Sequence, residues 1–246
     1  MKIASYNFRF GGKLGTDNQW QQLMRDLDPE IVFAQESFHP SRYFSAEEFA
    51  KFKGCVHTNV NHGHWGSAIV SKSHELEPLS LPQAEFEGWV VGARVPNLLI
   101  GAKPQSVLLF SIHAPSPGNY EKHVDKILSS ILEQWGNVPM ILGGDFNLTA
   151  AAVGGPNEIL KNTSGELKLF EKLKAELGLS NAWRHLHPAK DLPQTLRWTG
   201  DKEKPFHCDA IFLSQEHLNH LTSAHVESSG LWAKNSDHNP VLITLK

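Results

Sequence analysis

Short apolar runs, separated by polar turns, constrain the fold of this 246-residue chain more than any other feature. Their length is that of buried or half-buried β-strands. The longest reach about six residues, whereas a helix that crosses a bilayer needs about 20, so we expect no membrane insertion. The runs predict strands at Lys2–Asn7, Ile31–Gln35, Gly66–Ser71, Val90–Val95, Ser106–His113, Pro139–Gly143, Cys208–Ser214 and Val241–Leu245.

Three stretches between these runs have the spacing of amphipathic helices. The first begins after a cap at Thr16 or Asp17, and the second extends from Asn119 to Trp135. The third opens with a capping box of Thr163 and Glu166. Their expected buried faces carry Trp20, Leu23, Met24 and Leu27; Val124, Ile127, Leu128, Ile131, Leu132 and Trp135; and Leu167, Phe170, Leu173 and Leu177.

Many strands with a few long helices predict a layered α/β protein with two sheets. The sequence has no repeat of fixed period and no linker, and we interpret Ala150–Gly165 as a long surface loop. Residues 1–246 are therefore expected to form a single domain.

Charge and cysteine content narrow the classes of function. The 23 basic and 26 acidic residues give a net charge of −3, and no two Lys or Arg residues are adjacent. This pattern disfavours a protein that holds nucleic acid through a basic stripe, but not an enzyme that meets phosphate through a metal ion. With only Cys55 and Cys208, a disulfide scaffold or a zinc ribbon is disfavoured too. No apolar leader follows Met1, so the expected location is the reducing cytoplasm.

Unusual polar residues stand where the apolar runs end or begin. If the strands share one core, these side chains emerge at its rim, where a rigid scaffold can hold a site. They are Asn7, Glu36, His113, Asp145 and Asn147 after a run, and Asp209, Asp237 and His238 before one.

The chemistry of this set fits metal-assisted hydrolysis of a phosphate ester. Glu36, Asn7 and Asp237 are hard oxygen donors of the kind that suits Mg²⁺, Mn²⁺ or Ca²⁺ rather than zinc. His238 and Asp209 can form a carboxylate–imidazole pair, in which the carboxylate fixes the tautomer.

Taken singly, each of these residues also has an ordinary structural explanation. A carboxylate at a strand end commonly forms a turn or caps a helix. A lone His113 on an apolar strand is commonly a hydrogen-bonded core histidine, and Gly143–Asp145 can equally be a tight turn.

The order of six short motifs is more informative than any single residue. It resembles the endonuclease/exonuclease/phosphatase superfamily, and Gly144–Asn147 and Ser236–His238 are the most specific parts. The resemblance implies a DNase I-like four-layer α/β/β/α sandwich, with two mixed β-sheets face to face, helices outside and a site at one edge of the sheets. The motifs are Ser5–Asn7, Gln35–Glu36, Ser111–His113, Gly144–Asn147, Cys208–Phe212 and Ser236–Pro240.

The resemblance also implies a metal site. Glu36 is then the principal ligand of Mg²⁺, for which Mn²⁺ can substitute, and Asn7 and Asp237 assist it. The abasic-site endonuclease branch usually has a Lys where this chain has Phe38, and a second acidic ligand where it has Arg9. These departures disfavour a dedicated abasic-site enzyme.

Catalytic roles follow from the same resemblance. His238 with Asp209 faces the scissile phosphate, as a general base or as a charged stabiliser. Asp145 is the alternative water-activating carboxylate, and Asn147 is its positioning partner. His113 stands where nuclease and sphingomyelinase-like branches carry His, whereas the abasic-site branch usually has Tyr.

Substrate choice is expected to lie in the loops 61–65, 115–120, 150–165, 195–206 and 230–235. Trp65, Trp198 and Trp232 can stack on bases there or cap the core, and Arg197 can form a phosphate fork.

We therefore expect a monomer that hydrolyses phosphodiester bonds of nucleic acid, DNA rather than RNA. The alternative is a phosphatase or phosphodiesterase acting on a small phosphoester, such as a nucleotide, sugar phosphate or lipid head group, which the scattered positive charge favours. A non-catalytic binding scaffold is the least favoured, because the polar set is complete.

Overall fold

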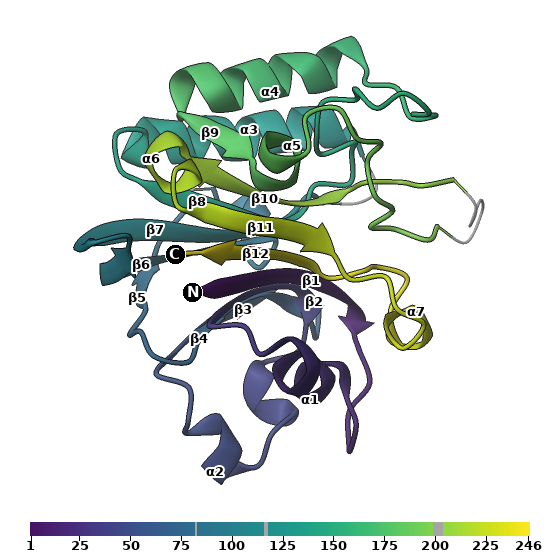
Figure 1. Cartoon of the computed structure of the whole chain (residues 1–246). Coiled ribbons are helices and arrows are strands. Elements are labelled where there is room, and N and C mark those ends of the chain that lie inside the picture. Colours follow the sequence, from purple (N-terminus) through teal and green to yellow (C-terminus); the bar gives the residue numbers. More distant parts are fainter. Residues whose placement is uncertain (82, 116–117, 199–203) are drawn as a thin grey trace.

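The computed structural model describes residues 1–81, 83–115, 118–198 and 204–246, in which two six-stranded sheets form the middle of the molecule (Figure 1). Residues 116–117 and 199–203 of two expected substrate loops lie outside the described residues. The first sheet has the order β11 (Leu221–Val226), β12 (Val241–Leu245), β1 (Lys2–Gly11), β2 (Ile31–Ser37), β4 (Gly66–Ser71), β3 (Gly54–Asn59). The second has the order β5 (Glu77–Leu79), β6 (Val90–Ile100), β7 (Lys103–His113), β8 (Met140–Asp145), β10 (Asp209–Ser214), β9 (Leu179–Asn181).

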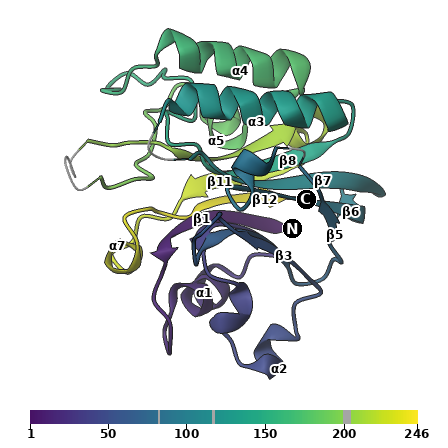
Figure 2. The ribbon, with the colours of Figure 1, turned by 180° about the vertical axis from the view of Figure 1, so that it is seen from behind.

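Helices cover the outer face of each sheet (Figures 1 and 2). On the second sheet lie the two long helices, α3 (Tyr120–Trp135) and α4 (Ser164–Glu176). On the first sheet lies α1 (Gln19–Gln22), continued by one π-helical turn at Leu23–Leu27. The short helices are α2 (Ala46–Phe49), α5 (Ala182–Leu186), α6 (Gln215–Leu218) and α7 (Trp232–Asn235). The predicted four-layer α/β/β/α sandwich is confirmed. Within the described ranges no helix is long and apolar enough to cross a membrane.

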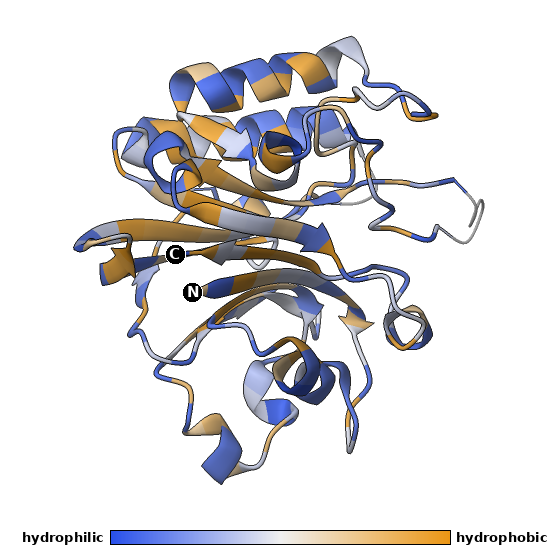
Figure 3. Cartoon of the chain, in the orientation of Figure 1, coloured by the Kyte–Doolittle hydropathy of each residue, from blue (hydrophilic) through white to orange (hydrophobic). Residues whose placement is uncertain are grey.

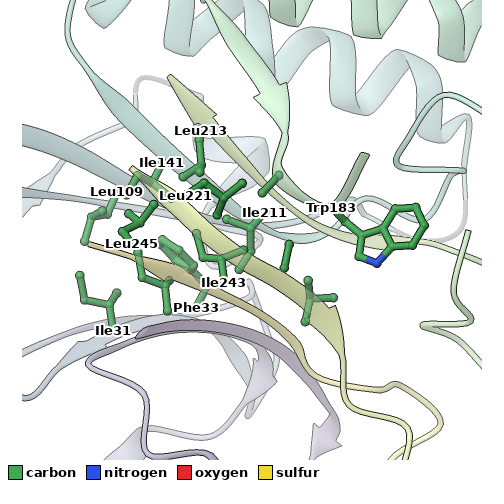
Figure 4. Close-up of a cluster of buried hydrophobic side chains, with 14 of the residues drawn as sticks. Ile31, Phe33, Leu109, Ile141, Trp183, Ile211, Leu213, Leu221, Ile243 and Leu245 are labelled. Carbon is green, nitrogen blue, oxygen red and sulfur yellow. The ribbon is translucent and has the colours of Figure 1, made fainter. Parts of the chain in front are cut away.

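Three apolar layers hold the sandwich together. The inner faces of the two sheets meet in one cluster, which includes Phe33 and Ile243 from the first sheet and Leu109 and Ile211 from the second (Figure 4). Separate clusters join each sheet to its helices. On α4, hydrophobic and hydrophilic residues alternate around the helix, whereas β7 and β12 are largely hydrophobic (Figure 3). Burial of these faces is the main stabilising contribution to the fold.

The eight predicted strands are the eight interior strands of the two sheets, and the four strands that the sequence did not predict are the edges: β11, β3, β5 and β9. An interior strand in a four-layer protein is covered on both faces, so its sequence is a nearly continuous run of apolar residues. Edge strands here are short or half-exposed. The pattern of β3, for example, is mostly of intermediate burial.

Two details of the helices differ from the prediction. Asn18, not Thr16 or Asp17, caps α1, and its side-chain oxygen accepts a hydrogen bond from the Gln21 amide. The Thr163–Glu166 capping box of α4 is confirmed, but Leu167 points away from the core, being 45% exposed. Leu169 takes its place among the buried residues of α4.

Strand direction brings the ends of six strands to one edge. β1 and β2 are parallel, as are β7 and β8, so their carboxyl ends lie together in each sheet. β12 is antiparallel to β1 and β10 is antiparallel to β8, so the starts of these strands reach the same edge. It is the edge toward which β1 points, on the right in Figure 1.

Candidate active site

Every polar residue that the sequence singled out at a strand end lies at or beside this edge. In the second sheet, Asp209 at the start of β10 is paired with Asp145 at the end of β8, which is next to His113. Asn7 of β1 reaches across from the first sheet, and its amide nitrogen lies 2.9 Å from Asp145 Oδ2. The contact joins the two sheets at the site.

Backbone irregularities at the ends of β1 and β2 determine how the site side chains of these strands are oriented. The pairing register of these strands shifts after Asn7, so the predicted strand ends are the points where regular pairing stops. Glu36 has φ of 49°, a left-handed conformation that is uncommon for residues other than glycine. Asn147 has φ of 53°. Such positions cluster at functional sites, where the surrounding structure holds them in place.

Two carboxylates face one another across the Asn7 amide. Asn7 Nδ2 donates to Glu36 Oε1 at 3.1 Å as well as to Asp145 Oδ2. His113 Nε2 lies 3.6 Å from Glu36 Oε1 and 3.8 Å from Asp145 Oδ2, beyond hydrogen-bond distance. We call these four residues the carboxylate cradle. Its members come from β1, β2, β7 and β8.

The imidazole–carboxylate pair forms as predicted. His238 Nδ1 lies 2.9 and 3.1 Å from the two oxygens of Asp209, which is fully buried. The other ring nitrogen, Nε2, lies 3.7 Å from Asp145 Oδ2, so the pair borders the carboxylate cradle. A carboxylate on Nδ1 orients the ring and leaves Nε2 to face a substrate.

Burial and charge shift the pKa values of these groups. Burial lowers the pKa of His238, but the carboxylates of Asp209 and Asp145 outweigh it and raise the value to about 10. Burial raises the pKa of Asp145, the His238 imidazole opposes this shift, and the Asp209 carboxylate adds to it. Strongly perturbed groups that meet at one edge of a fold are typical of active sites.

The cradle fits a divalent cation. Asp145 is buried and the Glu36 side chain is only 13% exposed. The groups that donate hydrogen bonds to these two carboxylates are neutral amides, from the Asn7 side chain and from the Phe10 and Asn147 backbone, and the His238 imidazole lies 3.7 Å from Asp145. Two such charges need a compensating cation, and carboxylate oxygens suit Mg²⁺ or Mn²⁺. His238, Asp145 and Asp209 also lie close enough to hold a metal, but His238 Nδ1 and Asp209 already bond to each other. The cradle is therefore a candidate cation site.

Two other predicted residues have different surroundings. Asp237 forms an ion pair with Arg9, whose Nε lies 3.4 Å from Asp237 Oδ2. Asn147 donates its backbone amide to Asp145 Oδ1 at 2.9 Å and its side-chain amide to the Ala114 carbonyl. Asn147 thus fixes the Asp145 carboxylate. The metal-ligand role of Asp237 stays a prediction, as do those of Glu36 and Asn7.

The loop residues divide into buried and exposed ones. Trp232 is 2% exposed and packs edge-on against Tyr6, so it belongs to the core and does not stack on bases. Arg197 donates to the carbonyls of Ser236 and His238, which gives it a structural role rather than that of a free phosphate fork. Trp198 is 53% exposed, and Trp65 lies beside His113, with ring centroids 5.8 Å apart.

Sequence reasoning missed two hydroxyl groups that support the site. The Thr195 hydroxyl, on a buried residue, accepts hydrogen bonds from the amides of Cys208 and Asp209. Ser236 donates to the Asn7 carbonyl and accepts from the His238 amide, and so connects β1 to the His238 loop. Ser236 lies within the quoted Ser236–Pro240 motif, whereas Thr195 has no signal in the sequence.

Comparison with known proteins gives one sequence relative and a shared fold. No family model matches the sequence. Carbon catabolite repressor protein 4 homolog 3 of Arabidopsis thaliana is 28% identical over 171 residues, covering 64% of this chain and 37% of that protein. The chain thus spans little more than a third of the length of this relative.

Solved structures of nucleases match the whole chain. A 3′-5′ exonuclease from Neisseria meningitidis superposes with a TM-score of 0.71 at 19% identity over 100% of both chains. An AP endonuclease from Archaeoglobus fulgidus gives a TM-score of 0.70 at 19% identity, over 100% of this chain and 99% of that one. This chain has the fold of these two enzymes.

Proposed function

We propose that this chain is a divalent-metal-dependent phosphodiesterase that cleaves nucleic acid, DNA rather than RNA. It has the DNase I-like fold of the endonuclease/exonuclease/phosphatase superfamily. The observation that carries the proposal is that the carboxylate cradle adjoins the Asp209–His238 pair, with Asp145 Oδ2 3.7 Å from His238 Nε2. The structural relatives named above are nucleases, and the sequence relative supports the same superfamily.

Glu36 would hold the cation, with the Asp145 carboxylate beside it. Asn7 would become a ligand only through Oδ1, which here accepts a hydrogen bond from the Arg9 amide at 2.9 Å, so its amide group would have to turn. A bound divalent cation supplies Lewis-acid polarisation of a phosphoryl oxygen and neutralises developing charge. His113, with its Nε2 toward both carboxylates, lines the space next to them. The preferred ion is Mg²⁺, with Mn²⁺ as a substitute, because the cradle offers hard oxygen donors.

Asp145 and His238 have separate roles in the proposed reaction. The Asp145 carboxylate, fixed by the Asn147 amide, accepts a proton from the attacking water. His238, whose Nδ1 is held by Asp209, presents Nε2 to the phosphate and stabilises its charge in the transition state. The work of the protein in such a reaction is mainly positioning and charge stabilisation.

The test is cleavage of supercoiled plasmid and end-labelled oligonucleotides in Mg²⁺ or Mn²⁺, with EDTA as the metal-free arm. We expect metal-dependent cleavage, and a loss of about 100-fold or more in kcat for His238→Ala. Glu36→Gln keeps the shape of the side chain and should lose both cleavage and the rise in melting temperature that the metal causes. Glu85→Gln is the matched control, because Glu85 is exposed and pairs with Lys126. Intact nucleic acid beside a cleaved positive control would refute the proposal.

A second candidate is hydrolysis of a small phosphoester at the same site. The net charge of −3 favours it, since a long polyanion gains little from such a surface. Phosphate release from a panel of nucleotides, sugar phosphates and lipid head groups, without cleavage of oligonucleotides, would select this candidate.

A further inference from the structure

Three aromatic side chains, one exposed and two half-buried, lie beside the carboxylate cradle and have no role in the proposed chemistry. One of them, Trp89, also packs against the apolar cluster between the second sheet and its helices. Phe10 lies within the pairing irregularity of β1, Trp65 precedes β4, and Trp89 precedes β6. The Phe10 and Trp65 ring centroids lie 6.2 Å apart, and those of Trp65 and Trp89 lie 5.5 Å apart, both edge to face. We call these three residues the aromatic ledge.

The aromatic ledge is continuous with the cradle. The rings of Trp65 and Trp89 lie 5.8 and 5.0 Å from the ring of His113. The His113 amide donates to the Trp89 carbonyl at 2.8 Å, and the Phe10 amide donates to Glu36 Oε2 at 2.7 Å. The backbone of the ledge is therefore bonded to two members of the cradle, and a ligand on the ledge would adjoin the phosphate site.

Phe10 is the most exposed part of the ledge, and its conformation has no packing explanation. Its side chain belongs to none of the apolar clusters and the residue is 68% exposed. Both Arg9 and Phe10 have positive φ, 56° and 51°, which is unfavourable for bulky residues. A strained backbone that presents a phenyl ring to solvent next to an active site indicates a functional constraint.

The turn that carries Phe10 is fixed before any ligand binds. The Gly12 amide donates to the Arg9 carbonyl at 3.0 Å, and the Tyr43 hydroxyl donates to the Gly11 carbonyl. Gly11 has φ of 89°, and a Cβ there would lie 2.4 Å from the Phe38 ring, so the turn is tightly enclosed. Such preorganisation reduces the ordering cost of binding.

A cleft with net positive charge adjoins the turn that carries Phe10. Arg9, with its side chain 46% exposed, lines this cleft of about 220 Å³ together with Arg197, Lys234 and Asp237. Arg9 forms an ion pair with Asp237, so the cleft has three cationic side chains and one carboxylate. A planar apolar group would fit the ledge, and an anion would fit the cleft. A nucleotide within a strand has both, since each base is joined to flanking phosphates.

We propose that the aromatic ledge binds an unpaired nucleobase next to the scissile phosphate, so that the substrate is a single-stranded segment or end of nucleic acid. This assignment rests on the proposed function. Aromatic side chains stack on bases of any sequence, and unpaired bases offer their faces freely, whereas paired bases are covered by their neighbours. With a net charge of −3, the chain also needs a contribution to affinity other than charge.

The test measures binding without turnover, so that it remains decisive if cleavage fails. Fluorescently labelled oligothymidylate, an oligomer of abasic spacers of equal length, and a blunt duplex are titrated with the protein in EDTA. We expect oligothymidylate to bind about 10-fold more tightly than the spacer oligomer, which corresponds to about 1.4 kcal/mol. Phe10→Ala should abolish this difference and Phe10→Tyr should restore it. Ile159→Ala, at a residue that is 63% exposed on another loop, should leave it unchanged.

Three results would overturn the assignment. They are equal binding of the thymidylate and spacer oligomers by the wild type, an unchanged preference in Phe10→Ala, and equal losses for single strand and duplex in that variant. Thymidine monophosphate that competes as well as the oligomer would reject a strand as the ligand. Thermal melting of each variant checks the fold. Base-dependent binding without cleavage of any phosphoester would support the ledge and refute the proposed hydrolase activity.

Discussion

Replacing Asp209 with alanine tests whether the buried pair with His238 acts as one electrostatic unit. Asp209 is 0% exposed and both its oxygens lie within 3.1 Å of His238 Nδ1. Removing one partner of a buried ion pair leaves the other charge in a low dielectric and commonly costs about 3–5 kcal/mol. Because the Asp145 carboxylate still attracts the ring from 3.7 Å, we expect the lower end of this range, about 3 kcal/mol.

A double-mutant cycle isolates the interaction. His238→Ala leaves the Asp209 carboxylate buried without its imidazole, and should cost a similar amount. The double variant removes both charges, so its loss of unfolding free energy should be about 2 kcal/mol smaller than the sum of the two single losses. The assay is urea denaturation at neutral pH, followed by fluorescence and circular dichroism. Losses that add to within about 0.5 kcal/mol would show that the two residues are energetically independent and refute the reasoning.

Three further predictions concern stability. Burial lowers the pKa of His217 to about 4, so the unfolded chain binds a proton that the folded chain does not, and stability falls as pH drops from about 6.5 toward 4. When urea unfolding is compared at pH 7 and pH 5, His217→Gln should lose about 2 kcal/mol less unfolding free energy than the wild type. Equal losses would contradict this assignment. Gly144→Ala would place a Cβ 1.9 Å from the Ile112 carbonyl oxygen and should cost about 3 kcal/mol of unfolding free energy in the same assay. Gly154→Ala, whose Cβ would have its nearest neighbour at 3.5 Å, should be almost neutral. Similar costs for the two variants would argue against the steric explanation. Trp232→Ala should lower the melting temperature, with a loss of about 3–5 kcal/mol, and a stable variant that loses oligothymidylate binding would contradict its place in the core.

The sequence predicts the interior of this fold well because the interior imposes a simple pattern. A strand covered on both faces excludes polar side chains along most of its length, as in β8, which is buried throughout and has a polar side chain only at its carboxyl end, Asp145. At an edge the constraint weakens. β9 spans only Leu179–Asn181, and the exposed and buried positions of β11 form no continuous apolar run. Short or mixed runs of this kind do not differ from loops by periodicity alone.

For the site, the sequence identifies which side chains meet but not which atoms do. Polar residues at strand ends converge because the strand directions bring six ends to one edge, and that much follows from the motifs and the fold they imply. The partition into a cradle around Asn7 and a separate pair of Asp209 with His238 depends on distances that no spacing along the chain contains. Likewise, the sequence alone does not distinguish Trp65 from Trp232. Only the structure shows that Trp65 is half-buried beside His113, whereas Trp232 is buried in the core.

Among the described residues, seven other than glycine have positive φ, and four of them lie in or beside the candidate site: Arg9, Phe10, Glu36 and Asn147. In regular strands, Glu36 and Phe10 would have negative φ, and their side chains would follow the alternation of faces along β2 and β1. Neither side chain would then have its observed position. Their left-handed conformations cost free energy, of order 1–3 kcal/mol each, which the surrounding core must offset. The hydrogen bond from the Phe10 amide to Glu36 couples the two irregularities, so one interaction sets both the cradle and the ledge. We therefore predict that changes in the turn at Arg9–Gly12 alter the proposed metal affinity and the proposed base-dependent binding together.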